Sequence, residues 1–334
     1  MNSILKRYRI FILSSSQKLT EFIKNTALEI GFDACGIAKA DFLEEDALFL
    51  KSWLSNEFNG EMSYLERNFE NRTDPRIMVK GCKSVIVTLL NYYPAQFQNP
   101  NVPKVSKYAY SKIDYHTIIK EKLLQLENRI IEQFGENVFN KKQQHRFVDS
   151  APVLERRWAQ RAGLGWIGKN KMLINPTLGS FCFIGVLMIN TELEYDDPIR
   201  NLCGTCRKCL DSCPTKALTV DRGLDARKCI SYQTIEKKGE ISEEIKPKLS
   251  GYIYGCDICN DVCPWNKSRA KATQTPEFEA SEDIINWETE DWKNLNEQEF
   301  NWVFKHSAVQ RAGFKKLREN IAIYTQIYSD STDI

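Results

Sequence analysis

Apolar residues recur at helical spacing in two long stretches of the N-terminal half. In Ser16–Phe32 they lie three or four positions apart and a glycine closes the pattern, which predicts a helix. Tyr115–Gly135 repeats this spacing and predicts a longer amphipathic helix. Between them, Lys83–Pro94 (KSVIVTLLNYYP) is a nearly continuous run of apolar and β-branched residues, which predicts a buried strand.

Shorter elements of both kinds follow. His145–Val153 has the pattern of a strand that runs into a turn, and Leu154–Gly163 is typical of a short helix that ends at a glycine. Ser180–Leu193 predicts a further strand. Because helices and strands are interspersed, we expect an α+β unit that extends to about residue 195.

The remaining chain changes character twice. A cysteine-rich, turn-rich segment leads into a polar linker, and Trp302–Tyr328 then reads as two helices separated by Gly313. We therefore divide the chain into a disordered lead-in (1–15), an α+β domain (16–195), a cysteine-rich domain (196–266), and a linker with a short helical C-terminal region (267–334).

Bulk composition changes this picture little. The chain has 334 residues, 42% hydrophobic and 27% charged, with a net charge of +2, which is ordinary for a globular protein. The charge is uneven, since 200–275 holds 14 Lys/Arg and 9 Asp/Glu, whereas 277–299 holds 9 acids and one base. A basic segment favours a polyanionic partner, although two solvated faces explain the charge more simply.

Nothing in the sequence indicates a membrane or secretory segment. No apolar run approaches the ~18 residues of a membrane span, and the N-terminal run IFIL is too short for a signal-peptide core. We expect a cytoplasmic monomer with no membrane partner.

Cysteine is the informative part of the composition. The chain has 11 cysteines, and eight of them lie between Cys203 and Cys263. Cytosolic thiols stay reduced, so such a cluster favours metal ligation over disulfides. The other three, Cys35, Cys82 and Cys182, have apolar neighbours and are interpreted as small core residues.

The spacing of the eight cysteines is that of a two-cluster ferredoxin. CGTCRKCLDSCP is followed by a displaced cysteine in KCI and then by CDICNDVCP. In such pairs the last cysteine of each run ligates the other cluster. We predict one 4Fe-4S cluster on Cys203, Cys206, Cys209 and Cys263, and a second on Cys213, Cys229, Cys256 and Cys259. Zinc knuckles, the alternative, use two C-x-x-C pairs rather than this pattern.

A glycine motif competes with this interpretation. GLGWIG, which begins at Gly163, fits the G-x-G-x-x-G fingerprint of dinucleotide-binding enzymes. That fingerprint must follow a strand and open a helix. Here a predicted helix precedes the motif and a loop and strand follow it, so we reject a nicotinamide or flavin site.

Several motifs together resemble one family. FVDSAPVLERRWAQRAGLGWIGKN, CGTCRKCLDSCPTKAL, CISYQTIEKKGEI and GYIYGCDICNDVCPWNK resemble, in this order, the epoxyqueuosine reductases of tRNA queuosine biosynthesis. The resemblance covers roughly residues 16–325. It implies a nitroreductase-like cobalamin-binding domain, a two-cluster ferredoxin-like domain and a helical, HEAT-like C-terminal region. The tail after Trp265 is shorter than in the longer members of the family. The resemblance therefore leaves open how much of the tRNA body, beyond the anticodon loop, this chain contacts.

The resemblance also implies the reaction. Epoxyqueuosine at the wobble position of tRNA is reduced to queuosine, with electrons from an external low-potential donor passing through two 4Fe-4S clusters to cobalamin. A cobalamin-dependent reductase of small molecules, akin to reductive dehalogenases, is one alternative. A non-catalytic two-cluster electron-transfer subunit is the other.

Asp149, in VDSAPVLER, is the candidate catalytic residue. Opening an epoxide and expelling its oxygen both need protons, and a carboxylic acid whose pKa is raised by desolvation is a suitable donor. The Asp of this motif has that role in the resembled family. The alternative is that Asp149 caps the helix that follows it.

Cofactor and substrate contacts are predicted with less support from the sequence. The lower-ligand motif D-x-H-x-x-G is absent, so we expect no histidine ligand to cobalt. Candidate cobalamin-binding residues are Arg72, Tyr110, Asp114, Tyr115, His116, Lys169, Asn170 and Ser231. Candidate tRNA contacts are Tyr232, Lys237 and Lys238, because lysines bind phosphates and tyrosine stacks on bases. Salt bridges and polar turns are the structural alternatives for all of these residues.

Overall fold

A four-stranded antiparallel sheet forms the centre of the protein in a computed structural model, which describes residues 14–139, 143–220 and 223–328. The strand order is β1-β2-β7-β4. Their bounds are Ala34–Lys39 (β1), Ser84–Asn91 (β2), Arg146–Phe147 (β4) and Cys182–Ile189 (β7). Every residue of β2 is buried, which confirms the strand predicted from its apolar run.

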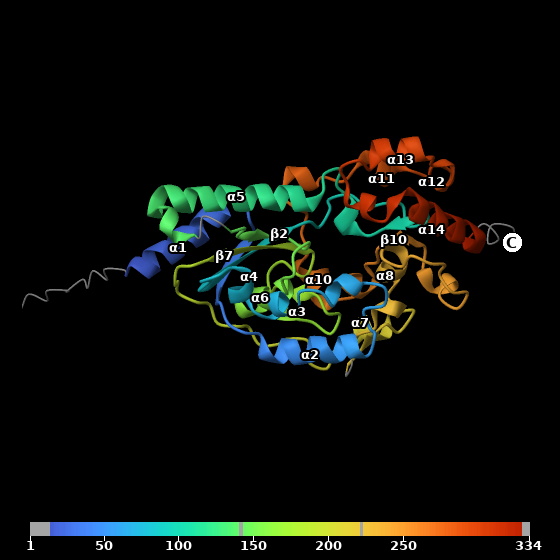
Figure 1. The fold of residues 1–334 in the computed structure, drawn as a ribbon. Coiled ribbons are helices and arrows are strands. Elements are labelled where there is room, and N and C mark those ends of the chain that lie inside the picture. The colour runs from blue at the N-terminus through green and yellow to red at the C-terminus, as the bar shows by residue number, and fades with distance from the viewer. Residues whose placement is uncertain (1–13, 140–142, 221–222, 329–334) are drawn as a thin grey trace, which may run out of the picture.

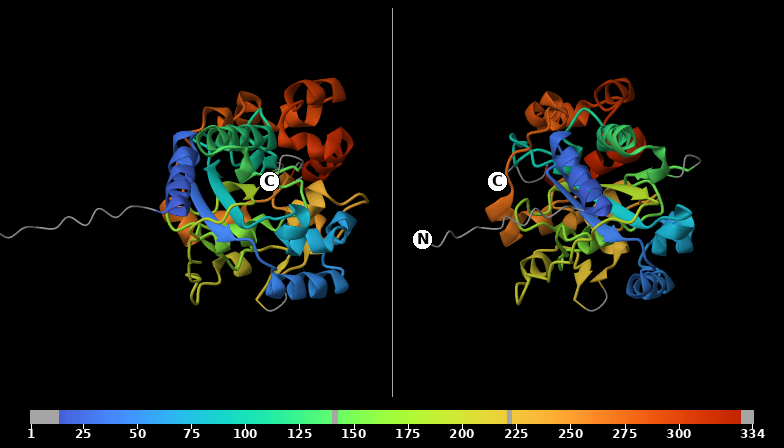
Figure 2. Two further views of the ribbon diagram at one scale, coloured as in Figure 1. Left: turned by 60° about the vertical axis from the view of Figure 1, so that its left-hand side comes forward. Right: turned by 90° about the vertical axis from the view of Figure 1, so that its left-hand side faces the viewer.

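Helices cover both faces of this sheet (Figures 1 and 2). On one face, α1 (Ser15–Glu29) and α5 (Tyr115–Phe134) bury their apolar stripes against β2 and β7. On the other face lies α6 (Glu155–Arg161), with Trp158 and Ala159 in a second core. A Cβ on Gly36 of β1 would lie 2.1 Å from the carbonyl oxygen of Ala162, so glycine permits the close approach of α6.

The start of α1 modifies the predicted lead-in. Residues 1–13 of that segment lie outside the described residues. Ser14 is instead the N-cap of α1: its hydroxyl accepts from the backbone N–H of Gln17, and the Gln17 side chain accepts from the backbone N–H of Ser14. The helix therefore begins at Ser15, inside the segment that we had assigned to the lead-in.

Short elements carry the connections around the sheet. Their bounds are Glu44–Ser55 (α2), Phe69–Thr73 (α3), Pro75–Met78 (α4), Lys104–Val105 (β3), Trp166–Ile167 (β5) and Leu173–Ile174 (β6). Several 3-10 turns accompany them, among them Ser63–Leu65 (η1). β5 and β6 pair antiparallel, so the glycine motif lies in a small hairpin that follows α6.

The cysteine-rich region is built from short helices and strands. They are Lys208–Asp211 (α7), Leu218–Thr219 (β8), Gly223–Leu224 (β9), Ile230–Ile235 (α8), Tyr252–Tyr254 (β10), Ile258–Asp261 (α9) and Pro264–Arg269 (α10). β10 pairs in parallel with β3, which joins this region to the N-terminal half of the chain.

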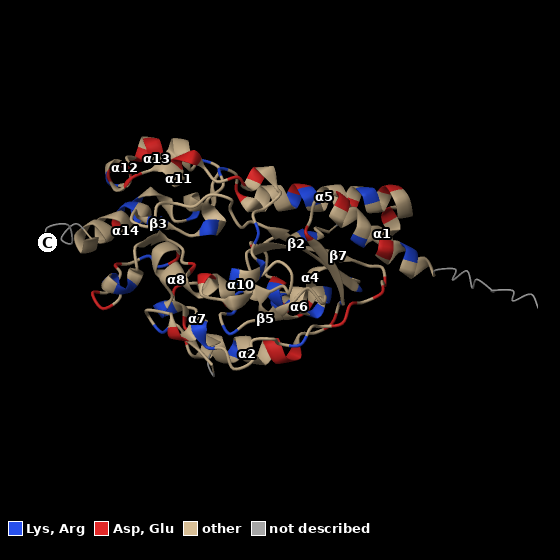
Figure 3. Cartoon of the chain, turned by 180° about the vertical axis from the view of Figure 1, so that it is seen from behind, with Lys and Arg blue, Asp and Glu red and all other residues tan. Residues whose placement is uncertain are grey.

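The C-terminal region is helical, but its helices differ from the predicted pair. They are Glu282–Asn286 (α11), Thr289–Asn294 (α12), Glu297–Val303 (α13) and Gly313–Tyr328 (α14), with a 3-10 turn, Ala308–Arg311 (η7), before α14. Trp302 lies at the end of α13 instead of starting a helix, and Gly313 begins α14. Acidic residues occur in α12 and α13 of this region (Figure 3).

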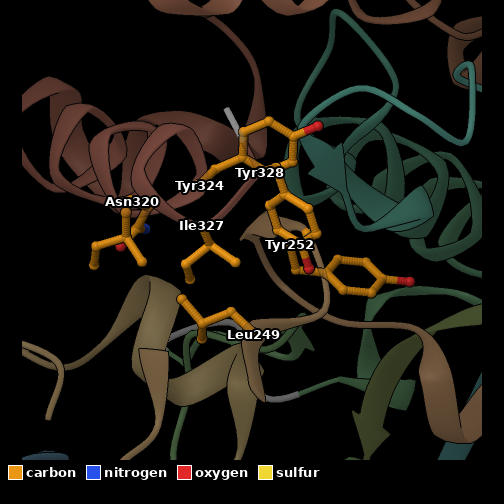
Figure 4. Close-up of a pocket in the computed structure, with 8 residues that line it drawn as sticks. Leu249, Tyr252, Asn320, Tyr324, Ile327 and Tyr328 are labelled. Atoms are coloured by element: carbon orange, nitrogen blue, oxygen red, sulfur yellow. The ribbon is translucent and has the colours of Figure 1, made fainter. Parts of the chain in front are cut away.

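Aromatic packing attaches the C-terminal helices to the rest of the protein. Trp292 and Phe304 share a core with Tyr110 and with Tyr254 of β10. A shallow groove between α14 and β10 is lined by Leu249, Tyr252, Asn320, Tyr324, Ile327 and Tyr328 (Figure 4). The Asn320 amide donates to the carbonyls of Thr234 and Ile253, at 2.9 Å each. These two hydrogen bonds attach α14 to the neighbouring segments.

Within the described residues, no helix is both long enough and apolar enough to cross a bilayer.

Candidate active site and cluster-binding region

Four of the predicted cluster ligands line one cavity. Cys203, Cys206, Cys209 and Cys263 surround a space of about 180 Å³. Cys203 and Cys206 precede α7, Cys209 lies within it, and Cys263 directly precedes α10. The two motifs meet in space as the crossed pairing predicts, because the last cysteine of the second motif faces the first three of the first.

The other four cysteines influence one another electrostatically. Burial raises the pKa of the Cys229, Cys256 and Cys259 thiols above the ordinary value. Neighbouring thiols raise the pKa further: Cys213 acts on Cys229, and both act on Cys259. The two sets also interact electrostatically, since Cys209 of the first set raises the pKa of Cys259.

This donor set fits iron–sulfur clusters. Among the described residues, no three His, Cys, Asp or Glu side chains converge tightly enough to hold a single metal ion. The first four thiols instead surround a volume, as the ligands of a cube-shaped cluster do. Thiolates are the ligands that such clusters require.

The wall of the first cavity comes from the glycine motif. The Trp166 indole N–H lies 3.4 Å from Sγ of Cys203. Lys169 Nζ donates to the carbonyls of Gly204 (2.7 Å) and Cys206 (2.8 Å). The Asn170 amide donates to the Asn260 side chain at 3.1 Å, behind the same cavity.

These contacts give the motif a role that we did not predict. We named Lys169 and Asn170 as candidate cobalamin contacts, and that assignment stays a prediction. The structure places both side chains on the wall of the first cysteine cavity. Gly165, at φ 158°, serves tight packing, because a Cβ there would lie 2.3 Å from the carbonyl oxygen of Ile174.

Asp149 lies in a strained loop between β4 and α6. Its backbone φ is 49°, in the left-handed region that non-glycine residues rarely adopt. Its backbone N–H donates to the carboxylate of Glu155 in the first turn of α6. The Asp149 side chain is 64% exposed. The N-cap of α6 is Leu154, with no side-chain cap, so the helix-capping alternative for Asp149 is wrong.

Two predicted residues lie at the Asp149 carboxylate, and a third holds one of them. The Tyr115 hydroxyl donates to Oδ2 of Asp149 at 2.9 Å, and Nε2 of His116 lies 3.6 Å from the same oxygen. On its other side, Nδ1 of His116 lies 2.7 Å from Oδ1 of Asp114, which also caps α5. Asp114, Tyr115 and His116 therefore form the surroundings of Asp149.

The charges of this group differ from our expectation. Burial disfavours the charged imidazole, but the carboxylates of Asp114 and Asp149 beside it raise the pKa of His116 to about 9. The nearby His116 imidazole lowers the pKa of Asp149, where we expected a raised value. Burial, with the nearby Asp149 charge, raises the pKa of Glu155 to about 8. At neutral pH, Asp149 is therefore ionised, while His116 and Glu155 hold protons.

Two site residues, Glu155 and Arg311, were not predicted. Arg311 of η7 donates to the Glu236 carboxylate at 2.7 Å and lies over the Tyr64 ring of η1 at 5.9 Å. Its charge helps to lower the pKa of Asp149. Arg311 is 162 positions from Asp149 in the sequence, and no local motif links the two.

Other predicted contacts have structural roles. Arg72 is buried, and its guanidinium donates to the carbonyls of Tyr64 (3.0 Å) and Arg67 (3.3 Å). Tyr110 is buried in the C-terminal core. Neither side chain contacts the Asp149 carboxylate, although the charge of Arg72 interacts with Glu155.

Two of the three residues predicted to contact tRNA make contacts within the protein. Tyr232 is 6% exposed and its hydroxyl accepts from the backbone N–H of Glu61, so it presents no face to a base. Lys237 lies 3.5 Å from the Glu61 carboxylate, and Lys238 alone of the three is exposed. Ser231 is half-buried, and its backbone N–H bonds to the Cys229 thiol.

Comparisons with known proteins agree with this arrangement. A family model described as a 4Fe-4S double cluster binding domain matches residues 202–266. A second, described as epoxyqueuosine reductase QueG, DUF1730, matches residues 72–150. An epoxyqueuosine reductase of Leadbetterella byssophila is 48% identical over 305 residues, covering 91% of this chain and 98% of the relative.

Solved structures extend the comparison to the fold. A crystal structure of epoxyqueuosine reductase with a tRNA-Tyr epoxyqueuosine-modified stem loop aligns with a TM-score of 0.79 at 29% identity, covering 94% of this chain and 82% of that one. An epoxyqueuosine reductase of Bacillus subtilis, with its catalytic Asp loop swung out of the active site, aligns with a TM-score of 0.80 at 29% identity and the same coverage. The cysteine framework, the fold and the sequence identity all agree, and the chain belongs to the epoxyqueuosine reductase family.

Proposed function

We propose that this protein reduces epoxyqueuosine to queuosine at the wobble position of tRNA, with electrons carried by two 4Fe-4S clusters to cobalamin and with Asp149 as proton donor. The observation that carries the proposal is the presence of two cysteine sets and an Asp149 proton site in one chain. A relative solved with an epoxyqueuosine-modified stem loop supports the substrate.

The reaction needs both electrons and protons, which suits a chain with two cysteine sets and a proton site at Asp149. Converting an epoxide to an alkene consumes two electrons and two protons and releases the oxygen as water. Iron–sulfur clusters carry single electrons, so two clusters suit a two-electron reduction. The chemistry that cobalamin supplies when bound is reduction of a carbon centre by low-valent cobalt.

A half-covered apolar wall beside the Asp149 loop fits a flat macrocycle. Eight partly buried hydrophobic residues pack against the core under α6, and six of them come from the Asp149 loop and the chain that follows it: Ala151, Leu154, Ile167, Leu178, Cys182 and Ile184. Leu154 follows the Asp149 loop, while Ile167 precedes the residues on the wall of the first cysteine cavity. A corrin held on this wall would have an apolar face beneath it, with the proton site and a cluster nearby.

The chain's own residues deliver the protons. His116 is held by Asp114 and stays protonated to a pH of about 9. We propose that Oδ2 of Asp149 takes a proton from Nε2 of His116 and passes it to the departing oxygen. The 3.6 Å gap between these atoms must shorten when substrate binds, as catalytic hydrogen bonds often do. Tyr115 orients the carboxylate through its 2.9 Å hydrogen bond.

Movement of the Asp149 loop is part of the proposal. The Bacillus subtilis relative was solved with its catalytic Asp loop swung out of the active site. The left-handed backbone of Asp149 and its single backbone bond to Glu155 suit a loop that has a second position. Swinging out would separate the carboxylate from His116.

We also propose the finer organisation. Residues 16–195 form a nitroreductase-like cobalamin-binding domain, 196–266 a ferredoxin-like domain, and 267–334 a linker with a HEAT-like helical region. The protein works as a cytoplasmic monomer with an external low-potential donor. Its short C-terminal region contacts mainly the anticodon loop.

The test is anaerobic reconstitution with iron, sulfide and cobalamin, followed by an assay on a tRNA stem loop bearing epoxyqueuosine. We expect corrin and cluster absorbance and the formation of queuosine. Corrin binding without queuosine would instead favour a small-molecule reductase. Clusters without corrin binding would favour an electron-transfer subunit.

A further inference from the structure

Lys169 is the cation built into the wall of the first cysteine cavity. Its Nζ donates to the carbonyls of Gly204 (2.7 Å) and Cys206 (2.8 Å), both in the loop that carries the first three ligands. In the described part of the chain, no carboxylate lies within ion-pair distance of this amine. The positive charge therefore faces backbone dipoles and the cavity, with no acidic partner to neutralise it.

Neighbouring contacts fix Lys169 in this position. The Trp166 indole N–H lies 3.4 Å from Sγ of Cys203. The Asn201 side chain accepts from the backbone N–H of Cys203 at 2.9 Å and donates to the carbonyl of Ile167 at 3.2 Å. The hairpin that follows α6 thus holds the ligand loop at several points, and Lys169 cannot easily turn away.

The charge has a direct physical consequence for a bound cluster. Reduction adds one negative charge to a 4Fe-4S cluster, and nearby positive charge and hydrogen bonding set its potential. A cation held at the edge of the cavity stabilises the reduced form more than a solvated surface lysine does, because water and salt screen the surface charge.

We infer that Lys169 is a positioning residue that raises the reduction potential of the cluster on Cys203, Cys206, Cys209 and Cys263 above the value it would otherwise have. The inference uses only the two clusters of the proposed function and requires neither cobalamin nor tRNA. The charge draws electrons toward the cluster whose cavity wall comes from the catalytic half of the chain.

A purely mechanical role is the alternative, and charge-conserving variants separate the two. Lys169→Gln removes the charge and keeps a donor, whereas Lys169→Arg keeps the charge. Lys208→Gln is the matched control, because Lys208 is an exposed lysine on α7 between two ligands of the same cluster. Cys263→Ser identifies which redox signal belongs to this cluster.

The experiment is an anaerobic potentiometric titration of the reconstituted full-length chain, followed by electron paramagnetic resonance and iron analysis. We expect Lys169→Gln to lower the midpoint potential of one cluster only, the one that Cys263→Ser removes. The midpoint potential of this cluster in Lys169→Arg should stay near the wild-type value. Lys208→Gln should shift that potential less than Lys169→Gln does.

Unchanged potentials in Lys169→Gln with full iron content would overturn the inference, as would an equal shift in Lys169→Arg. If Lys169→Gln loses iron from this cluster, retention of iron and potential by Lys169→Arg supports the role of charge, and the same loss in Lys169→Arg contradicts it. The titration contains neither tRNA nor cobalamin. Its result therefore stands even if the queuosine assay of the proposed function fails.

Discussion

The cysteine-rich region and the Asp149 site represent two ways of building a functional centre. Three ligands of the first cavity lie within seven residues, and short motifs supply most of the rest. The Asp149 site instead draws on the start of α5, the loop after β4, the first turn of α6 and η7. Local spacing therefore encodes the electron carriers, whereas tertiary folding assembles the proton site.

Their electrostatics also differ. Burial raises the pKa of the thiols at Cys229 and Cys259, so these ligands need the charge of bound iron to become thiolates. At Asp149, hydrogen-bonding partners lower the pKa of the carboxylate, and the proton is stored on His116. The charge state of the cysteine-rich region depends on a bound cofactor, whereas the charge state of the Asp149 site is set by its own side chains.

The largest effect should come from exchanging single cysteines. Cys263→Ser and Cys213→Ser should each lose one cluster, roughly half of the bound iron, and all turnover, because each is predicted to ligate the other motif's cluster. Iron analysis with electron paramagnetic resonance measures this. The crossed pairing is wrong if Cys263→Ser spares the signal that Cys203→Ser removes.

His116→Gln should reduce turnover by roughly 10²-fold, since it removes the proton store of Asp149. The wild-type rate should fall as the pH rises through about 9, where His116 loses its proton, and the variant should lack this limb. Because folding raises this pKa, its stabilising effect is complete below the unfolded pKa and disappears as the pH rises through about 9. A pH–rate profile and unfolding at pH 6 and pH 10 measure both effects.

Arg311→Gln should have a smaller effect on the same site. Removing this charge lets the pKa of Asp149 rise toward its ordinary value, so the acid limb of the pH–rate profile should move to higher pH. Lys315→Gln, an exposed neighbour, is the control. An unchanged acid limb would show that Arg311 does not act on Asp149.

Tyr115→Phe should have the smallest effect, about 1 kcal/mol in the barrier, or several-fold in rate. It removes the hydroxyl that donates to Asp149 but keeps the ring stacked on Phe183 at 4.1 Å. Single-turnover rates measure it. A loss as large as that of His116→Gln would mean that Tyr115 itself transfers a proton.

The same contrast explains what could be predicted from sequence. Cysteine spacing indicated which four thiols share the first cavity, and apolar periodicity located α1, α5 and β2. Residue type alone misplaced Tyr232, because a tyrosine beside a cluster motif does not reveal that its hydroxyl is buried against Glu61. Sequence also did not reveal the partners of Lys169, since they are backbone carbonyls 35 and 37 residues away.

The proton site was predicted in part for a similar reason. Asp149 and the run Asp114–His116 could be singled out as chemically apt, but their contact depends on how α5 lies over the sheet. The lowered pKa of Asp149 follows from that contact, so the sequence alone suggested the opposite direction. Glu155 and Arg311 carried no local signal of a role at the site.

The central claim is that electrons from the clusters and protons through Asp149 meet on one epoxide. Its most direct test is a single-turnover measurement in which reduced, cobalamin-loaded enzyme is mixed with a stem loop bearing epoxyqueuosine. Asp149→Asn is compared with the exposed control Asp197→Asn. We predict unchanged cluster and corrin spectra and queuosine formation at least roughly 10²-fold slower in Asp149→Asn alone. Queuosine formation by Asp149→Asn at the wild-type rate would contradict the account.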